Sequence, residues 1–262
     1  MEIDDLKLMI EATKEVASEV YKDGLKPSVQ EAGKLLARPL KIINTCFQGI
    51  DIWLEKRDYN LEKTKVILAE KIKNIPEDKL TTPEPYIAVP AIEAISYSMD
   101  NEQLKNMYAN LLARAMLKSE QSKVHPSFVE IIKQLSPNDA LLFKEIMERE
   151  ASPIIHLSVV QDIGNNEYHY NLNWKDNYNE SNVSLSNLQR LGLIEIPNNE
   201  MAYSLDDVYN IVRESKGYKK VCQELKEKYP QNDIHEDKSF VNTNALSRSF
   251  YEVCLDDDIR YY

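Results

Sequence analysis

The strongest constraint on the fold is a regular run of apolar residues between residues 100 and 116. Apolar side chains recur there every three or four residues: Leu104, Met107, Tyr108, Leu111, Leu112, Ala115 and Met116. That spacing places them along one face of a helix. Asp100 and Gln103 have the spacing of a capping box just ahead of the run. The segment therefore predicts an amphipathic helix that buries one face.

The neighbouring segments predict further helices. Residues 60–74 have a helical pattern, and the proline-rich stretch IPEDKLTTPEP is typical of a linker. The segment PYIAVPAIEAISYSM predicts a helix with Pro90 in its first turn, where a missing N–H is tolerated. Two more helix starts follow, because Ser127 and Glu130 have capping-box spacing, and Ser136, Pro137 and Asp139 repeat the device.

The first 54 residues predict a helix at residues 3–21 and then a long apolar stripe at residues 25–54, bent at Pro39. Five cations and two acids at residues 22–41 give a local charge of 5 − 2 = +3. Apolar helix faces usually meet protein, so we expect core or oligomer contact here, with binding to an anionic membrane surface as the alternative. The candidate interaction residues are Leu25, Val29, Lys34, Leu36, Arg38, Leu40, Lys41, Ile43 and Phe47.

The character of the sequence changes after Pro153. IIHLSVV predicts a buried strand, and alternation from Tyr168 to Trp174 predicts a half-buried strand. A short helix ending at Gly192 is followed by two short strands around PNNE, which is the outline of a winged helix. A helix at residues 206–229, a loop at 230–244 and a frayed tail LDDDIRYY complete the prediction.

These patterns predict a mainly α protein, α+β overall, in two domains. Residues 1–150 would form a helical domain, with the basic stripe at 25–54 and core helices at 85–150. Residues 151–262 would form a winged-helix-like module with a small antiparallel sheet and C-terminal helices. The chain is long enough, at 262 residues, to hold two such domains.

Charge disfavours nucleic acid as a partner. The chain carries a formal charge of −11, and residues 151–200 hold two cations and six acids, a balance of 2 − 6 = −4. Duplex binding normally neutralises several phosphates with Lys or Arg, so the winged-helix outline favours protein contact. The three cysteines are far apart and no secretory signal is recognised at the start, which predicts a reduced, cytoplasmic setting, with peripheral contact at the inner membrane surface as an alternative.

Motifs of common catalytic classes are missing from the sequence. It has no GxGxxG, P-loop or GxSxG pattern, and the four histidines lack metal-ligand spacing, so we expect no cofactor and no metal site. The acidic pairs at 206–207 and 256–258 are explained by a helix first turn and by the tail. Weak catalytic candidates are Arg114, His125 and Glu130, but His125 lies where a side chain can cap a helix.

The segments PYIAVPAIEAISYSMDNEQLKNMYANLLARAML and KVHPSFVEIIKQLSPNDALLF resemble the core signature of the Abi-alpha family of bacterial abortive-infection proteins. The similarity continues more loosely through LSNLQRLGLIEI, and YKDGLKPSVQEAGKLL is similar to the opening of the family. The resemblance implies a role in phage defence, and it supplies no catalytic residues. The matched positions include His125, Pro126, Ser127 and Phe128.

Together these observations predict an anti-phage protein that acts through protein–protein contacts or self-assembly, as an oligomer, rather than through bond-breaking chemistry. Two alternatives remain open. The stripe at 25–54 could make the protein a membrane-surface-binding toxic effector. The protein could also be a nuclease or another hydrolase without a recognisable motif, with Arg114, His125 and Glu130 as the residues to test.

Overall fold

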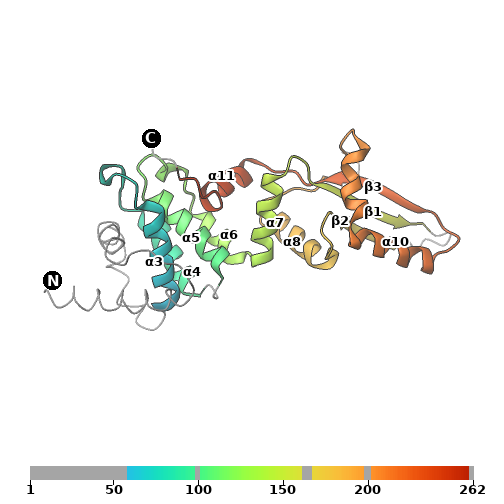
Figure 1. The fold of residues 1–262 in the computed structure, drawn as a ribbon, viewed down its shortest axis with the longest axis horizontal. Coiled ribbons are helices and arrows are strands. Elements are labelled where there is room, and N and C mark those ends of the chain that lie inside the picture. The colour runs from blue at the N-terminus through green and yellow to red at the C-terminus, as the bar shows by residue number, and fades with distance from the viewer. Residues whose placement is uncertain (1–57, 98–100, 161–166, 198–201, 260–262) are drawn as a thin grey trace.

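The structure is a computed structural model that describes residues 58–97, 101–160, 167–197 and 202–259. The predicted helix at 3–21 and the interaction stripe at 25–54 lie outside the described residues. The molecule is elongated, with packed helices at one end and a small sheet at the other (Figure 1). The predicted class, mainly α and α+β overall, is confirmed.

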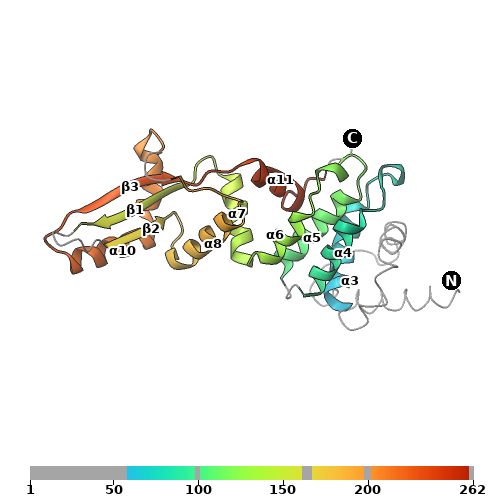
Figure 2. The same cartoon turned by 180° about the vertical axis from the view of Figure 1, so that it is seen from behind.

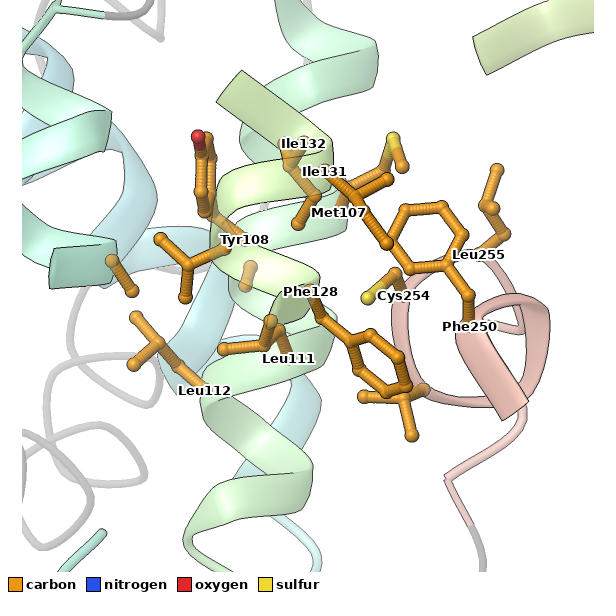
Figure 3. Close-up of a cluster of buried hydrophobic side chains, with 14 of the residues drawn as sticks. Met107, Tyr108, Leu111, Leu112, Phe128, Ile131, Ile132, Phe250, Cys254 and Leu255 are labelled. Carbon is orange, nitrogen blue, oxygen red and sulfur yellow. The ribbon is translucent and has the colours of Figure 1, made fainter. Parts of the chain in front are cut away.

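In the described residues, five α-helices precede the sheet. We call them, together with α8 (Tyr178–Arg190) and α11 (Ala245–Cys254), the helical body. The bounds of the five are α3 Asp58–Ile72, α4 Pro85–Tyr97, α5 Glu102–Ala115, α6 Ser127–Gln134 and α7 Pro137–Glu148. The apolar face of α5 lies in the centre and contacts α3, α4 and α6. Figure 3 shows this core, where Leu111 of α5 lies near Phe128 of α6, and both side chains are buried with Tyr108 and Leu112. The predicted amphipathic helix is therefore confirmed.

Helix starts differ in detail from the sequence prediction. The cap of α5 is Asn101, whose side chain accepts the N–H of Leu104 at 3.0 Å, one residue after the predicted Asp100. Helix α4 begins at Pro85, so Pro90 lies inside the helix rather than in its first turn. The capping box of α7 is present as predicted, with Ser136 and Asp139 bonding each other's backbone N–H.

The sheet has three antiparallel strands in the order β2-β1-β3. They are β1 Pro153–Val159, β2 Glu167–Leu172 and β3 Ile234–Phe240. The first two strands were predicted. The third was predicted as loop, and that prediction was wrong: Ile234–Phe240 pairs with β1 along its whole length. Its charged residues concealed the strand, although charged side chains are common on the edge of a sheet.

Two helices pack beside the sheet where one was predicted at 206–229. The segment forms a 3-10 turn η4 Asp206–Tyr209, then α9 Asn210–Glu214 and α10 Lys216–Lys228. The break falls at Ser215, whose side chain caps α10 by accepting the N–H of Tyr218. We call the strands with η4, α9 and α10 the sheet lobe. Figures 1 and 2 show α10 running alongside the strands.

The winged-helix outline stays a prediction. Helix α8, Tyr178–Arg190, ends as expected, because Gly192 has φ 73° and the N–H of Leu193 returns to the carbonyl of Leu188. In residues 193–197, which follow this helix end, the backbone pairing is a single bridge between Glu195 and Asn242. Residues 202–205 form no strand. The antiparallel sheet of the protein is built from β1, β2 and β3 instead.

The end of the chain returns to the helical body. Helix α11, Ala245–Cys254, packs on α5 and α7, and Phe250 contacts both Phe128 and Phe143. The predicted frayed tail is wrong for its described part, residues 255–259, because side chains of α3 and α5 bind its backbone and Asp257. Three consecutive aspartates are typical of a solvated chain end, and no residue near them in the sequence indicates their partners.

Within the part of the chain that the structure describes, buried apolar residues form two clusters. The larger fills the helical body and includes Leu185 and Leu188 of α8 and Phe250 of α11. The smaller lies between the sheet and its helices and consists of Ile155, Leu157, Val159, Leu172, Tyr209, Val212, Val221 and Leu225. The larger cluster therefore joins segments from before and after residue 150. The two domains predicted with a boundary at that residue stay a prediction.

Candidate interaction surface

The two sides of the sheet have different neighbours. Side chains alternate between the faces of a strand, and residues paired across antiparallel strands share a face. Ile155, Leu157 and Val159 of β1 face α9, α10 and η4, in the smaller apolar cluster. We call this side the helix side. The intervening residues of β1 must lie on the opposite side.

The opposite side carries polar and aromatic groups in two rows across the strands. In one row Tyr168, Ser158 and His235 are paired across β2, β1 and β3. In the next row His156 is paired with Asp237, and its ring lies 5.6 Å from that of Tyr170. We call the side with His156, Ser158, Tyr168, Tyr170, His235 and Asp237 the open face.

Exposure on the open face increases toward the edge strands. His156 and Ser158, on the central strand, are 7% and 6% exposed. Tyr168 and Tyr170, on β2, are 48% and 52% exposed, and their rings stack at 5.7 Å with 10° between their planes. His235 on β3 is also exposed. A pair of stacked tyrosine rings at the surface is an amphipathic contact area that loses little conformational freedom on binding.

The central histidine is held in one orientation. The N–H of Asn171 donates to Nδ1 of His156 at 3.0 Å, and Asn171 adopts a left-handed backbone conformation with φ 57° next to an irregularity in the strand register. Burial lowers the pKa of His156, against the opposing effect of the Asp237 charge. Because Nδ1 accepts a hydrogen bond and the ring is buried, the imidazole is neutral at pH 7 with its proton on Nε2.

The open face holds a serine, two histidines and an aspartate, but they do not form a catalytic relay. Among the described residues, no hydrogen bond joins Ser158, His235 and Asp237 to one another. A nucleophile needs a base within hydrogen-bond reach to be activated. The described segments also contain no group of three or more His, Cys, Asp or Glu side chains arranged to hold a metal ion.

The helix side, by contrast, carries a network of ion pairs. Arg213 binds Asp206 at 3.0 Å and Glu236 at 2.5 Å, while Lys238 binds Asp206 and Tyr218 donates to Glu236. Burial alone would raise the pKa of Glu236, but the hydrogen bonds from Arg213 and Tyr218 outweigh it and lower this pKa. These charges hold α9 and α10 against β3.

Arg114, one of the three catalytic candidates, binds the C-terminal segment. Arg114 is 4% exposed, and its guanidinium donates to the carbonyls of Val253, Asp256 and Asp258 at 3.4, 3.0 and 3.2 Å. Burial lowers its pKa, and the nearby Asp256 carboxylate opposes that shift. Because three backbone carbonyls accept hydrogen bonds from the buried guanidinium, Arg114 has a structural role in holding the C-terminal segment.

His125 and Glu130, the other candidates, lie at the surface near the start of α6. His125 Nδ1 accepts the N–H of Ser127 at 3.1 Å and lies 2.7 Å from its hydroxyl oxygen, so His125, rather than Ser127, caps the helix. Glu130 pairs with Lys133 at 3.0 Å. No hydrogen bond or ion pair in the described residues joins Arg114, His125 and Glu130 to one another.

Sequence reasoning did not identify the open face. It recognised the alternation of Tyr168 and Tyr170, which predicts a strand, but not which side would be exposed. It also missed His235 and Asp237, because the strand that carries them was predicted as loop. A signal was present, since His235, Asp237 and Ser239 alternate with Ile234, Glu236 and Lys238.

Within the described part of the chain, no helix has the length and apolar character to cross a bilayer.

The helices of the body and the strands of the sheet fall within one matched region. The model of a protein family described as abortive infection alpha matches residues 56–254, which is well over half of the chain. Searches of curated proteins and of solved structures found no match. The matched region covers nearly all the described elements, from α3 to α11, including the open face. This chain therefore belongs to the abortive infection alpha family.

Proposed function

We propose that the protein acts in abortive infection against phage by binding another protein through the open face of its sheet. Membership of the abortive infection alpha family supports the defence role. The exposed, stacked pair Tyr168 and Tyr170 is the observation that supports this site of contact. Aromatic residues are enriched in protein interfaces, where they often supply much of the binding energy.

The positions of the catalytic candidates support binding over hydrolysis. Arg114 is occupied by three carbonyls, His125 caps a helix and Glu130 pairs with Lys133. Hydrolysis carried out by these candidates would need at least two of them to converge on a substrate. Defence should therefore survive His125→Ala in a protein that keeps its fold. Loss of defence by a folded His125→Ala variant would favour a hydrolase.

The test of the open face is a double variant, Tyr168→Ser with Tyr170→Ser. We expect phage plating on bacteria that produce the variant to rise to the level without the protein, while circular dichroism and the melting temperature stay close to wild type. The matched control is Tyr86→Ser on α4, another exposed tyrosine at 59% exposure, which should retain protection. Full protection by the double variant would reject the open face as the contact.

The stripe at residues 25–54 supports self-assembly as a second route to protein contact. Its apolar residues recur at helical spacing in the sequence, and a basic flank accompanies them. Replacing Leu36, Leu40 and Ile43 by Asp should abolish protection and change the mass measured by light scattering. Unchanged mass and full protection would reject this route. Flotation of the wild-type protein with vesicles that contain anionic lipid, at low salt, would favour the membrane alternative instead.

A further inference from the structure

The charges of the sheet lobe are divided between its two sides. The cations that contact the sheet on the helix side, such as Arg213 and Lys238, are paired with Asp206 and Glu236 there. On the open face, the strand residues that point outward include no Lys or Arg. Their one carboxylate is Asp237, which is half-buried, and His156 beside it is neutral. The open face is therefore aromatic and weakly acidic.

The spacing of these groups suits an extended chain laid across the strands. Tyr170, His156 and Asp237 form a row over β2, β1 and β3. Strands in a sheet are about 4.8 Å apart, so the carboxylate lies roughly 10 Å from the Tyr170 backbone. A peptide of three or four residues covers that distance when extended. One bound segment can thus contact the tyrosine pair and Asp237 together.

We propose that the open face binds an extended segment of a protein partner that carries arginine or lysine, with the cation at Asp237 and an aliphatic stem or second cation against Tyr168 and Tyr170. This inference rests on the proposed function and specifies the chemistry of the partner. Guanidinium groups stack on aromatic rings and bind carboxylates through two parallel hydrogen bonds, so arginine satisfies both parts of the face.

The same charges argue against two other macromolecules. Nucleic acid would bring phosphates to a face whose strands offer a carboxylate and no Lys or Arg, although bases could stack on the tyrosines. An anionic membrane would meet the same repulsion. A neutral apolar peptide would contact the rings but would leave Asp237 without a counter-ion. A cationic segment is the occupant that complements the whole face.

The binding test uses two fluorescein-labelled peptides that differ in charge alone. One alternates four arginines with glycines, and the other carries citrulline, a neutral isostere, in place of each arginine. Fluorescence anisotropy should give tight binding for the arginine peptide and weak binding for the citrulline peptide. Asp237→Asn should weaken arginine-peptide binding about tenfold, the effect of one charge-assisted hydrogen bond.

A matched control separates a specific contact from general attraction to an acidic protein. Glu214→Gln removes the same charge from an exposed position on α9, on the other side of the sheet, and should change arginine-peptide affinity little. Equal effects of Asp237→Asn and Glu214→Gln would overturn the inference, as would equal binding of the citrulline peptide. Tighter binding of a labelled oligouridylate, lost in the Tyr168→Ser, Tyr170→Ser variant, would overturn it in favour of RNA.

Phage protection separates this inference from the proposed function. We expect Asp237→Lys to abolish protection, because it would repel a cationic partner, and Asp237→Asn to reduce it. Melting temperatures would verify that both variants fold. If the double tyrosine variant loses protection while both Asp237 variants keep it, the contact stands and the cationic partner is rejected. If the double tyrosine variant keeps protection, the proposed function and this inference both fail.

Discussion

The helical body buries one arginine, Arg114, against backbone carbonyls, whereas the sheet lobe pairs Arg213 with carboxylates beside the sheet. Arg114 is 4% exposed and bound to three carbonyls, while Arg213 is held by two carboxylates near the surface. The apolar cores differ as well, because eight buried residues form the smaller cluster of the lobe and the body holds a much larger one. The body has the contacts of a stable scaffold, and the lobe has exposed tyrosines on one face of its sheet.

The largest expected effect concerns the core of the body. Phe250→Ala would remove a ring that contacts Phe128 and Phe143, so the free energy of unfolding should fall by about 3–5 kcal/mol. Urea denaturation measures this change. Tyr170→Ala, at an exposed ring of the lobe, should change stability by no more than about 0.5 kcal/mol. A loss of less than about 1 kcal/mol for Phe250→Ala would show that α11 is not part of the scaffold.

Leu225→Ala tests whether the lobe is a separate cooperative unit. Leu225 is 1% exposed in the smaller cluster, and its truncation should destabilise the lobe by about 2–4 kcal/mol. Hydrogen exchange should then accelerate in β1, β3 and α10 while amides of α5 keep their protection. Equal acceleration in α5 would mean that body and lobe unfold together, and the comparison between them would lose its basis.

Gly217→Ala tests the contact that joins α10 to α8. A Cβ on Gly217 would lie 2.8 Å from the Cβ of Tyr178, which is too close for two carbon atoms. The clash should cost about 1–3 kcal/mol, less a gain of up to about 1 kcal/mol from the helix propensity of alanine. Lys219→Ala, exposed on the same helix, is the control and should be nearly neutral. A stabilised Gly217→Ala variant would show that the helices can separate there.

The smallest effect is acid sensitivity, to which one carboxylate in each region should contribute. Burial would raise the pKa of Asp257, but Asn106, Lys71 and Asn110 lower it from 3.8 to about 2. Its contribution to the stability of the body is therefore complete above pH 3.8 and is lost as the pH falls through about 2. Hydrogen bonds from Lys228 and Tyr229 likewise lower the pKa of Glu167, in the lobe, from 4.5 to about 2.

Unfolding in urea at pH 6 and pH 2.5 measures these contributions. Asp257→Asn should lose less stability than wild type between the two pH values, with the difference found in amides of α5. Glu167→Gln should give the corresponding difference in β2 and α10. If both variants keep the wild-type pH dependence, these carboxylates do not contribute to the acid sensitivity of the body or of the lobe.

Local periodicity and capping were predictable from sequence, because they depend on neighbours within four residues. The apolar face of α5, the capping box of α7, strands β1 and β2 and the end of α8 at Gly192 were all recognised in this way. The position of His125 at a helix start was recognised too. These features explain why the scaffold was predicted better than the site.

Long-range pairing explains what the sequence did not predict. Strand β3 is stabilised by β1, which precedes it by about 80 residues. The charges of its Glu236 and Lys238 are paired with Arg213 and Asp206 from another segment. Asp257 meets Asn110 across 147 residues. A local sequence pattern does not indicate contacts between residues so far apart. The charged strand β3 was therefore predicted as a loop, and the bound segment at residues 255–259 was predicted to be frayed. The open face depends on β3 and was missed with it.

The distance in sequence between Arg114 and its acceptors also affects biosynthesis. The guanidinium enters the body on α5, but the carbonyls that it binds belong to residues 253–258. While a ribosome is translating the intervening residues, this cation lacks these carbonyls, and Phe128 and Phe143 lack their contact with Phe250. The nascent chain can pair its early helices, yet it cannot finish its core before residue 258 emerges. Truncated products should therefore be substrates for chaperones and proteases.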